Sequence, residues 1–338
     1  MNKKNLSILK YIFFLGIGFF LVWWQFDKMT GEEKNEFAES LKNADYLIII
    51  PVIIMSLLSH ISRSIRWKLL MEPMGYAPRL STTFYSVMIG YLVNTFLPRA
   101  GEVVRCSLLG KKEKIPFNKL VGTVLLERTF DLFCYLLLII ITILIQVRFV
   151  TGFIKEKISS VSESTAGSSI PIKIIFILFS LIAGIVLVRF IFRRYAHHHY
   201  IISIKGFHIG LMEGFKTIIH LKKRTQFISH TIFIWSMYVL QIYIGFYALP
   251  ATTGLSLVHA CSVLSLATLA MIVSPGGIGA FPLAVQEILS LYKIENVSFG
   301  WLIWGTSTAI VIVAGLICFG LYMYQKIEKN EIQPATGK

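Results

Sequence analysis

Residues 80–110 read LSTTFYSVMIGYLVNTFLPRAGEVVRCSLLG, and this stretch constrains the topology of the whole chain. It is apolar enough to enter a membrane, but the break Pro-Arg-Ala-Gly at residues 98–101 interrupts it. Basic residues flank it on both sides: Arg63, Arg66, Lys68 and Arg79 before it, and Lys111, Lys112, Lys114 and Lys119 after it. Because loops rich in Lys and Arg stay in the cytoplasm, both ends are expected on the same side. We therefore predict a re-entrant hairpin of two short helices that enters from the cytoplasm.

The composition predicts an all-α polytopic membrane protein with a single membrane domain over residues 1–338. Hydrophobic residues make up 55% of the chain and charged residues only 15%, with a mean hydropathy of +0.68. A soluble domain carries about a quarter charged residues, so this apolar surplus must face lipid. Lys and Arg outnumber Asp and Glu by 33 to 18, a net charge of +15. In a membrane protein this excess indicates orientation and contact with anionic lipid, and we expect no nucleic-acid partner.

Six stretches have the length and apolarity of full spans. They are residues 8–26, 46–62, 117–147, 170–192, 227–249 and 299–324. The acidic segment 27–45 is expected outside. Residues 189–224 carry eight Lys or Arg residues against one Glu, so the basic connector 193–224 is expected in the cytoplasm. Both termini then lie in the cytoplasm.

A second interrupted stretch, residues 257–292, breaks at Ser-Pro-Gly-Gly-Ile-Gly and is predicted to be a hairpin that enters from the outer side. Residues 1–147 and 170–324 then share one plan, namely helix, helix, hairpin and helix. Opposite sides of entry make them an inverted repeat, and such repeats place binding sites where their broken helices meet. The alternative is that both breaks are Pro or Gly kinks in ordinary spans, which leaves the charge pattern unexplained.

Charged residues gather at the first break and in the helix that follows it. They are Arg99, Glu102 and Arg105 at the break, and Glu127, Arg128 and Asp131 in the helix. Glu127 lies about ten residues into its span, roughly 15 Å deep, near the middle of a hydrocarbon core of about 30 Å. An ionisable group there costs at least about 2.5 kcal/mol, so it should be paired or face a cavity. These residues are the candidate functional site.

Two interpretations of the cluster stay open at this level. In the first, the charges form a closed structural network, with Glu102 neutralising Arg128 and Asp131 neutralising Arg99 or Arg105. In the second, the arginines of the hairpin are left for an anion from the substrate, because guanidinium groups bind phosphate with two parallel hydrogen bonds. The second interpretation makes the cluster a substrate-binding site.

In the second interpretation, backbone N–H groups at the two breaks can also bind the anion. The helix that returns from the first break starts near Gly101, and its free N–H groups can face an anion. Three glycines at the second break, Gly276, Gly277 and Gly279, permit positive φ angles and can present further amides. The alternative for this second break is a tight turn that binds nothing.

The sequence favours neither an enzyme nor a metal protein. It contains no P-loop, no GxGxxG and no HExxH, and its four cysteines are too far apart to form a metal pair. The run His197-His198-His199 points in different directions on a helix and has no acidic partner nearby. No nucleophilic dyad falls within the central motifs, as an enzyme acting on lipid phosphate would need. We therefore expect no catalytic activity, no cofactor and no metal.

Three motifs carry a resemblance to a known family: NTFLPRAGEVVR at residues 94–105, ERTFD at 127–131 and PGGIG at 275–279. In these motifs, and in their order, the chain resembles the lysylphosphatidylglycerol synthase transmembrane region, a flippase-like family of integral membrane proteins. The resemblance implies a protein of the bacterial inner membrane that moves lipids or lipid-linked precursors between leaflets.

The chain departs from the family pattern in two places. Large members continue into a cytoplasmic aminoacyl-transferase domain, whereas this sequence ends shortly after its last predicted span, so lysyl transfer is not expected. Many relatives also have a glutamate shortly after the glycine-rich break, where this chain has Phe281 and Pro282. A proton-coupling role for the second hairpin is therefore not supported.

The leading hypothesis is a transporter in which an anionic lipid head group binds Arg99 and Arg105 between the hairpin tips. The alternative is a membrane partner that transports nothing and stabilises or regulates a lipid-modifying enzyme. A closed charge network without a cavity would favour this alternative. The sequence makes no prediction about the oligomeric state.

Overall fold

The computed structural model describes residues 3–97, 99–146, 221–271 and 274–331, and these ranges are predominantly helical, with no β-strand among them. The all-α prediction is confirmed there. The described helices belong almost wholly to one compact unit, made of residues 1–142 and 220–338. The predicted span 170–192 and most of the connector 193–224 lie outside the described residues.

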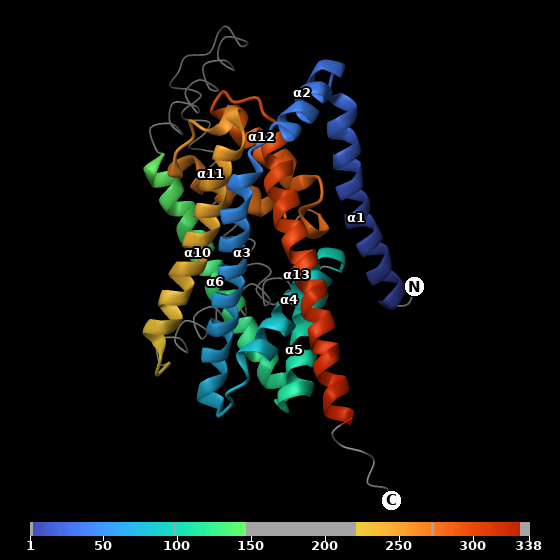
Figure 1. Cartoon of the computed structure of the whole chain (residues 1–338), viewed down its shortest axis with the longest axis vertical. Coiled ribbons are helices and arrows are strands. Elements are labelled where there is room, and N and C mark those ends of the chain that lie inside the picture. Colours follow the sequence, from blue (N-terminus) through green and yellow to red (C-terminus); the bar gives the residue numbers. More distant parts are fainter. Residues whose placement is uncertain (1–2, 98, 147–220, 272–273, 332–338) are drawn as a thin grey trace, which may run out of the picture. The chain divides into compact units, whose positions relative to one another are not determined.

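The described ranges contain four helices that are long and apolar enough to span a membrane. They are α3 (Tyr46–Met71), α6 (Phe117–Ile145), α10 (Arg224–Gly245) and α13 (Ser298–Glu331), all labelled in Figure 1. Each contains most of one predicted span. The predicted span 8–26 lies within a further helix, α1 (Lys3–Lys28).

The acidic segment after α1 forms the short helix α2 (Gly31–Lys42). Thr30 begins it: the Thr30 hydroxyl accepts the N–H of Glu33 at 3.2 Å, and the Glu33 carboxylate accepts the N–H of Thr30 at 2.7 Å. This reciprocal cap satisfies two amide groups that the first turn would otherwise leave unpaired. The position of this segment outside the membrane stays a prediction.

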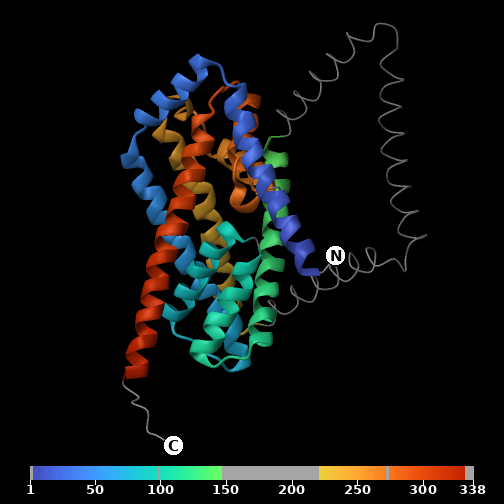
Figure 2. The same ribbon diagram turned by 90° about the vertical axis from the view of Figure 1, so that its right-hand side faces the viewer.

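The first interrupted stretch forms two helices, α4 (Leu80–Phe96) and α5 (Ala100–Glu113), which lie side by side (Figures 1 and 2). Their contact depends on Gly101, because a Cβ there would lie only 1.9 Å from the carbonyl oxygen of Gly90. Arg99 turns the chain between them with a φ of 67°, in the left-handed region. The two helices of the predicted hairpin are thus present, and their entry from the cytoplasm stays a prediction.

The second interrupted stretch forms α11 (Leu257–Ala270), the single turn η4 (Pro275–Gly277) and α12 (Ala280–Leu291). The order helix, helix pair, helix therefore occurs twice, first in α3 to α6 and again in α10 to α13. The tip of the second pair touches the first: a Cβ at Gly276 would lie 3.3 Å from the carbonyl oxygen of Thr95, near the end of α4. The inverted orientation of the two halves stays a prediction.

Helices of the two halves pack against each other, not only within their own half. α3 lies along α10, where the Ser62 hydroxyl is 2.8 Å from Nδ1 of His230. α13 lies along α4 (Figure 2), and the Tyr135 hydroxyl of α6 donates to the carbonyl oxygen of Ser265 in α11. The C-terminal half of α3 also contacts α6, where the Trp67 indole N–H donates to the Thr123 hydroxyl at 2.8 Å.

Candidate functional site

Glu127 of α6 is the centre of a buried charge network between α3, α5 and α6. Its side chain has no exposed surface. Three arginines donate to its carboxylate: Arg63 at 3.0 Å, Arg66 at 3.1 Å and Arg105 at 3.0 Å. None of these three pairs is in the closed-network interpretation of the sequence, and two of the arginines come from α3.

Asp131, one helical turn after Glu127, is held by the same two arginines of α3. Arg63 approaches its Oδ2 at 2.9 Å and Arg66 its Oδ1 at 2.7 Å. Each guanidinium also reaches α10, where Arg63 donates to the Tyr238 hydroxyl at 3.1 Å and Arg66 to the Thr231 hydroxyl at 3.1 Å. Planar guanidinium groups suit this arrangement because they donate several hydrogen bonds in fixed directions.

Arg63 and Arg66, two of the basic residues that flank the hairpin, are buried inside the protein and only 4% and 0% exposed. The predicted span ended at Ser62, whereas α3 continues to Met71. Its added turns bury the large side chain of Trp67, so the arginines lie inside a packed helix. One signal in the sequence pointed to this: two arginines three residues apart share a helix face, as do two acids four residues apart in α6.

Arg128 and Glu102 form a second, outer ion pair. The Arg128 guanidinium donates to Glu102 Oε1 at 2.9 Å, and the Asn94 amide donates to Glu102 Oε2 at 3.3 Å. The two charged side chains are 39% and 27% exposed. This pairing agrees with the closed-network interpretation, but Asp131 pairs with neither Arg99 nor Arg105 in the structure.

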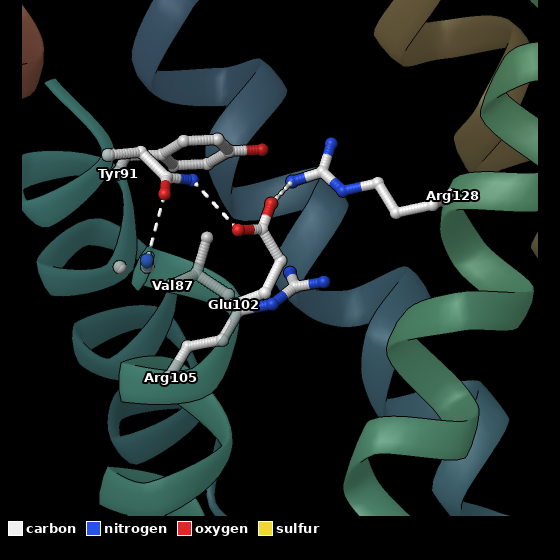
Figure 3. A pocket seen from close by; sticks show the side chains of 8 residues that line it. Val87, Tyr91, Glu102, Arg105 and Arg128 are labelled. Carbon is white, nitrogen blue, oxygen red and sulfur yellow. Dashed lines mark hydrogen bonds and ion pairs between the residues drawn. The ribbon is translucent and has the colours of Figure 1, made fainter. Parts of the chain in front are cut away.

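A small cavity adjoins this outer pair (Figure 3). It is lined by Val87, Gly90, Tyr91, Asn94, Gly101, Glu102, Arg105 and Arg128. Its empty space is about 160 Å³, including the part that opens to the surroundings. Pockets for drug-sized ligands have about 300–1,000 Å³, so this cavity is too small for such a ligand.

The charges around the cavity favour an anion. Four arginines and three carboxylates meet in the inner and outer groups together, which leaves one net positive charge. The Nε atoms of all four arginines, Arg63, Arg66, Arg105 and Arg128, are buried and have no hydrogen-bond partner among the described residues. Every carboxylate of the network is taken by arginine, and no three metal-binding side chains gather within the ranges that the structure describes.

Arg99 and Gly101 differ from their predicted roles. Arg99 is exposed, does not line the cavity and has no ion pair with another described residue. The pair of arginines at the cavity is thus Arg105 and Arg128, not Arg99 and Arg105. Gly101 lines the cavity, but its N–H donates to Asn94 Oδ1 at 2.8 Å, so this amide is already used.

The three glycines of the second tip serve close packing. Gly276, Gly277 and Gly279 all have positive φ angles. A Cβ at Gly279 would lie 2.7 Å from the carbonyl oxygen of Gly18 in α1, and the carbonyl oxygen of Gly276 accepts the indole N–H of Trp304 at 2.8 Å. The N–H of Gly277 donates within its own turn, at 3.0 Å. These contacts agree with the tight-turn alternative better than with an anion site.

Comparisons with known proteins agree with the membrane architecture. The family model of the lysylphosphatidylglycerol synthase TM region matches residues 8–318. A UPF0104 membrane protein of Methanocaldococcus jannaschii is 31% identical over 116 residues, which is 33% of this chain and 33% of that relative. No solved structure matches the chain. The chain is therefore a multi-pass membrane protein that belongs to the family of the lysylphosphatidylglycerol synthase transmembrane region.

Proposed function

We propose that the protein moves a phosphate-bearing anionic lipid between the leaflets of the membrane. The observation that carries the proposal is the small cavity bordered by Arg105 and Arg128, next to a buried network with one excess positive charge. A buried arginine cluster attracts an anion strongly because water does not screen it there. The phosphate of a lipid is the anion that a membrane supplies in greatest amount.

The arginines at the cavity support a phosphate group in particular. Guanidinium groups match phosphate oxygens in geometry, and Arg128 is 39% exposed, so it is accessible to a ligand. The space of about 160 Å³ has no room for acyl chains. In the proposed complex the head group enters the cavity while the tails stay in the bilayer.

The depth of the charges supports transport. Glu127 is ten residues from the start of α6, or roughly 15 Å along the helix, about half the thickness of the hydrocarbon core. Charges at this depth are costly and usually mark a pathway. Our proposal includes a bacterial inner-membrane location, cytoplasmic termini and two inverted halves that rock around the site.

A second candidate function is a partner that transports nothing and stabilises or regulates a lipid-modifying enzyme. The observation in its favour is that the inner network of Arg63, Arg66, Glu127 and Asp131 is closed and buried. This candidate predicts a persistent complex on purification and no lipid exchange by the isolated protein. The reconstitution experiment below separates the two candidates.

Arg128→Gln is expected to slow the exchange of a fluorescent phosphatidic acid between the leaflets of reconstituted vesicles at least about tenfold. A lost charge-assisted hydrogen bond to phosphate accounts for a change of this size. The rate is measured by quenching of the outer leaflet, in vesicles without protein, with wild-type protein and with the variant.

The matched control is Arg79→Gln, which removes the same charge from an exposed position and should exchange lipid at the wild-type rate. Each variant must insert into the vesicles to the same extent as the wild type and elute at the same volume during purification. Equal rates for Arg128→Gln and the wild type would contradict the proposed site. A wild-type rate no higher than that of empty vesicles would favour the partner candidate.

A further inference from the structure

We propose that the Glu102 carboxylate occupies the place of the substrate phosphate, and that a phosphate monoester binds by displacing it from Arg128. This inference rests on the proposed function and adds a resting state and a substrate class to it. The site would be closed by its own side chain until a stronger anion arrives.

The first support is the geometry of Glu102. Its carboxylate lines the cavity, and Figure 3 shows it pointing toward the Arg128 guanidinium. It is held by Arg128 at 2.9 Å and by the longer Asn94 contact at 3.3 Å. This is how a ligand anion would be held, by one charged donor and one amide donor.

The second support is the contrast between the carboxylates. Glu127 has no exposed surface and three arginine partners, whereas Glu102 is 27% exposed and has one. A half-buried pair with one charged partner contributes little stability, while breaking a fully buried pair is costly. Glu102 is therefore the carboxylate of the network that a ligand can displace at least cost.

The third support is the charge that displacement leaves behind. With Glu102 turned away, four arginines face only Glu127 and Asp131, so two positive charges remain. A phosphate monoester carries about −1.5 to −2 charges at neutral pH and balances them, whereas a diester carries one. The Arg128 guanidinium, released from Glu102, can then donate to the phosphate oxygens.

Displacement also has a mechanical consequence. The pair Glu102–Arg128 ties the first turn of α5 to α6, and the pair Arg105–Glu127 ties the next turn. When phosphate takes Arg128, Arg105–Glu127 remains as the ion pair between α5 and α6 in the described ranges, beside the apolar packing of this region. The tip of the hairpin is then freed from α6 while its base stays attached, which couples binding to movement of the hairpin.

The test is the affinity of the full-length protein in detergent for three probes, measured by titration calorimetry. The probes are inorganic phosphate, dioctanoyl phosphatidic acid and dioctanoyl phosphatidylglycerol. Glu102→Gln is expected to bind phosphatidic acid at least about tenfold more tightly than the wild type, because the competing charge is gone. Phosphatidylglycerol, a diester, is expected to gain clearly less.

Two further variants separate displacement from a general change in charge. Glu102→Asp keeps the charge on a shorter side chain that cannot reach Arg128 as well, and it is expected to gain affinity to an intermediate degree. Glu287→Gln makes the same charge change at an exposed position of α12 and should gain nothing. If one Glu102 variant fails to fold, the affinity of the other still tests whether phosphate displaces Glu102.

The outcomes are distinct. A gain with both phosphatidic acid and inorganic phosphate supports displacement by the phosphate alone, and a gain with phosphatidic acid only supports a lipid source. Unchanged affinity in both Glu102 variants overturns the displacement, and an equal gain for the diester overturns the monoester assignment. The proposed function is tested separately, by lipid exchange in vesicles with the wild-type protein. If exchange is observed, the proposed function holds even when the displacement or the monoester assignment fails. If no exchange is observed, the proposed function is rejected.

Discussion

Glu127→Gln is expected to lower the free energy of unfolding by about 5 kcal/mol, the upper end of the range for breaking a buried ion pair. The variant removes the one carboxylate that Arg63, Arg66 and Arg105 share. The four arginines of the combined network would then have only Asp131 and Glu102 as carboxylate partners. Three of these arginines, Arg63, Arg66 and Arg105, have almost no exposed surface. Uncompensated buried positive charge accounts for the size of the effect.

Equilibrium unfolding in mixed detergent micelles measures this loss. Glu287→Gln, the same change at an exposed glutamate, should alter stability by less than about 0.5 kcal/mol. Adding Arg105→Met to Glu127→Gln should restore part of the loss, because it removes one of the stranded charges. A loss below about 1 kcal/mol for Glu127→Gln would show that the network is not buried as described.

Arg66→Met is expected to lower the free energy of unfolding by roughly 3 kcal/mol, the lower end of the same range. Arg66 has no exposed surface and contacts Glu127, Asp131 and Thr231. Methionine fills much of its volume without the charge. Both carboxylates keep Arg63 as a partner, so this variant should cost less than Glu127→Gln.

The control for Arg66→Met is Arg79→Met, at an exposed position directly before α4. It should leave the unfolding curve almost unchanged. The order of the losses in free energy of unfolding is the sharper test. Glu127→Gln should lose most, Arg66→Met less, and Arg79→Met almost nothing. Equal unfolding curves for the two arginine variants would mean that Arg66 is not part of a buried ion-pair network.

The sequence could predict the elements with strong local signals. Long apolar runs located the four helices α3, α6, α10 and α13, and the Pro and Gly breaks located the short helix pairs. The pairing of Glu102 with Arg128 was also among the alternatives, because both lie in adjacent motifs. These features depend on residues close together in the chain.

The role of Arg63 and Arg66 could not be predicted in the same way. Arginines at the end of an apolar run usually mark the membrane surface, and their carboxylate partners lie more than 60 residues later. Only the structure shows that the helix α3 continues past Arg63 to Met71. It also shows that the arginines of α3 contact Glu127 of α6. A spacing of three or four residues on two helices is consistent with this pairing but does not require it.

The surroundings of Arg99 and of the glycines could not be predicted for a related reason. Their motifs predicted a turn, which the structure shows, but a turn alone does not say what faces it. Gly276 and Gly279 lie against other helices, and Arg99 is exposed and is not among the residues that line the cavity. Contacts between distant segments settled both points.

The most direct test of the central claim is to photolabel the wild-type protein in membranes with a phospholipid that carries a diazirine beside its phosphate. A diacylglycerol with the same diazirine reports general contact with lipid. We expect the phospholipid alone to label peptides of α4 and α5 that line the cavity, and Arg128→Gln to lose this labelling. Labelling confined to other surfaces, or unchanged in Arg128→Gln, would contradict a phosphate site in this cavity.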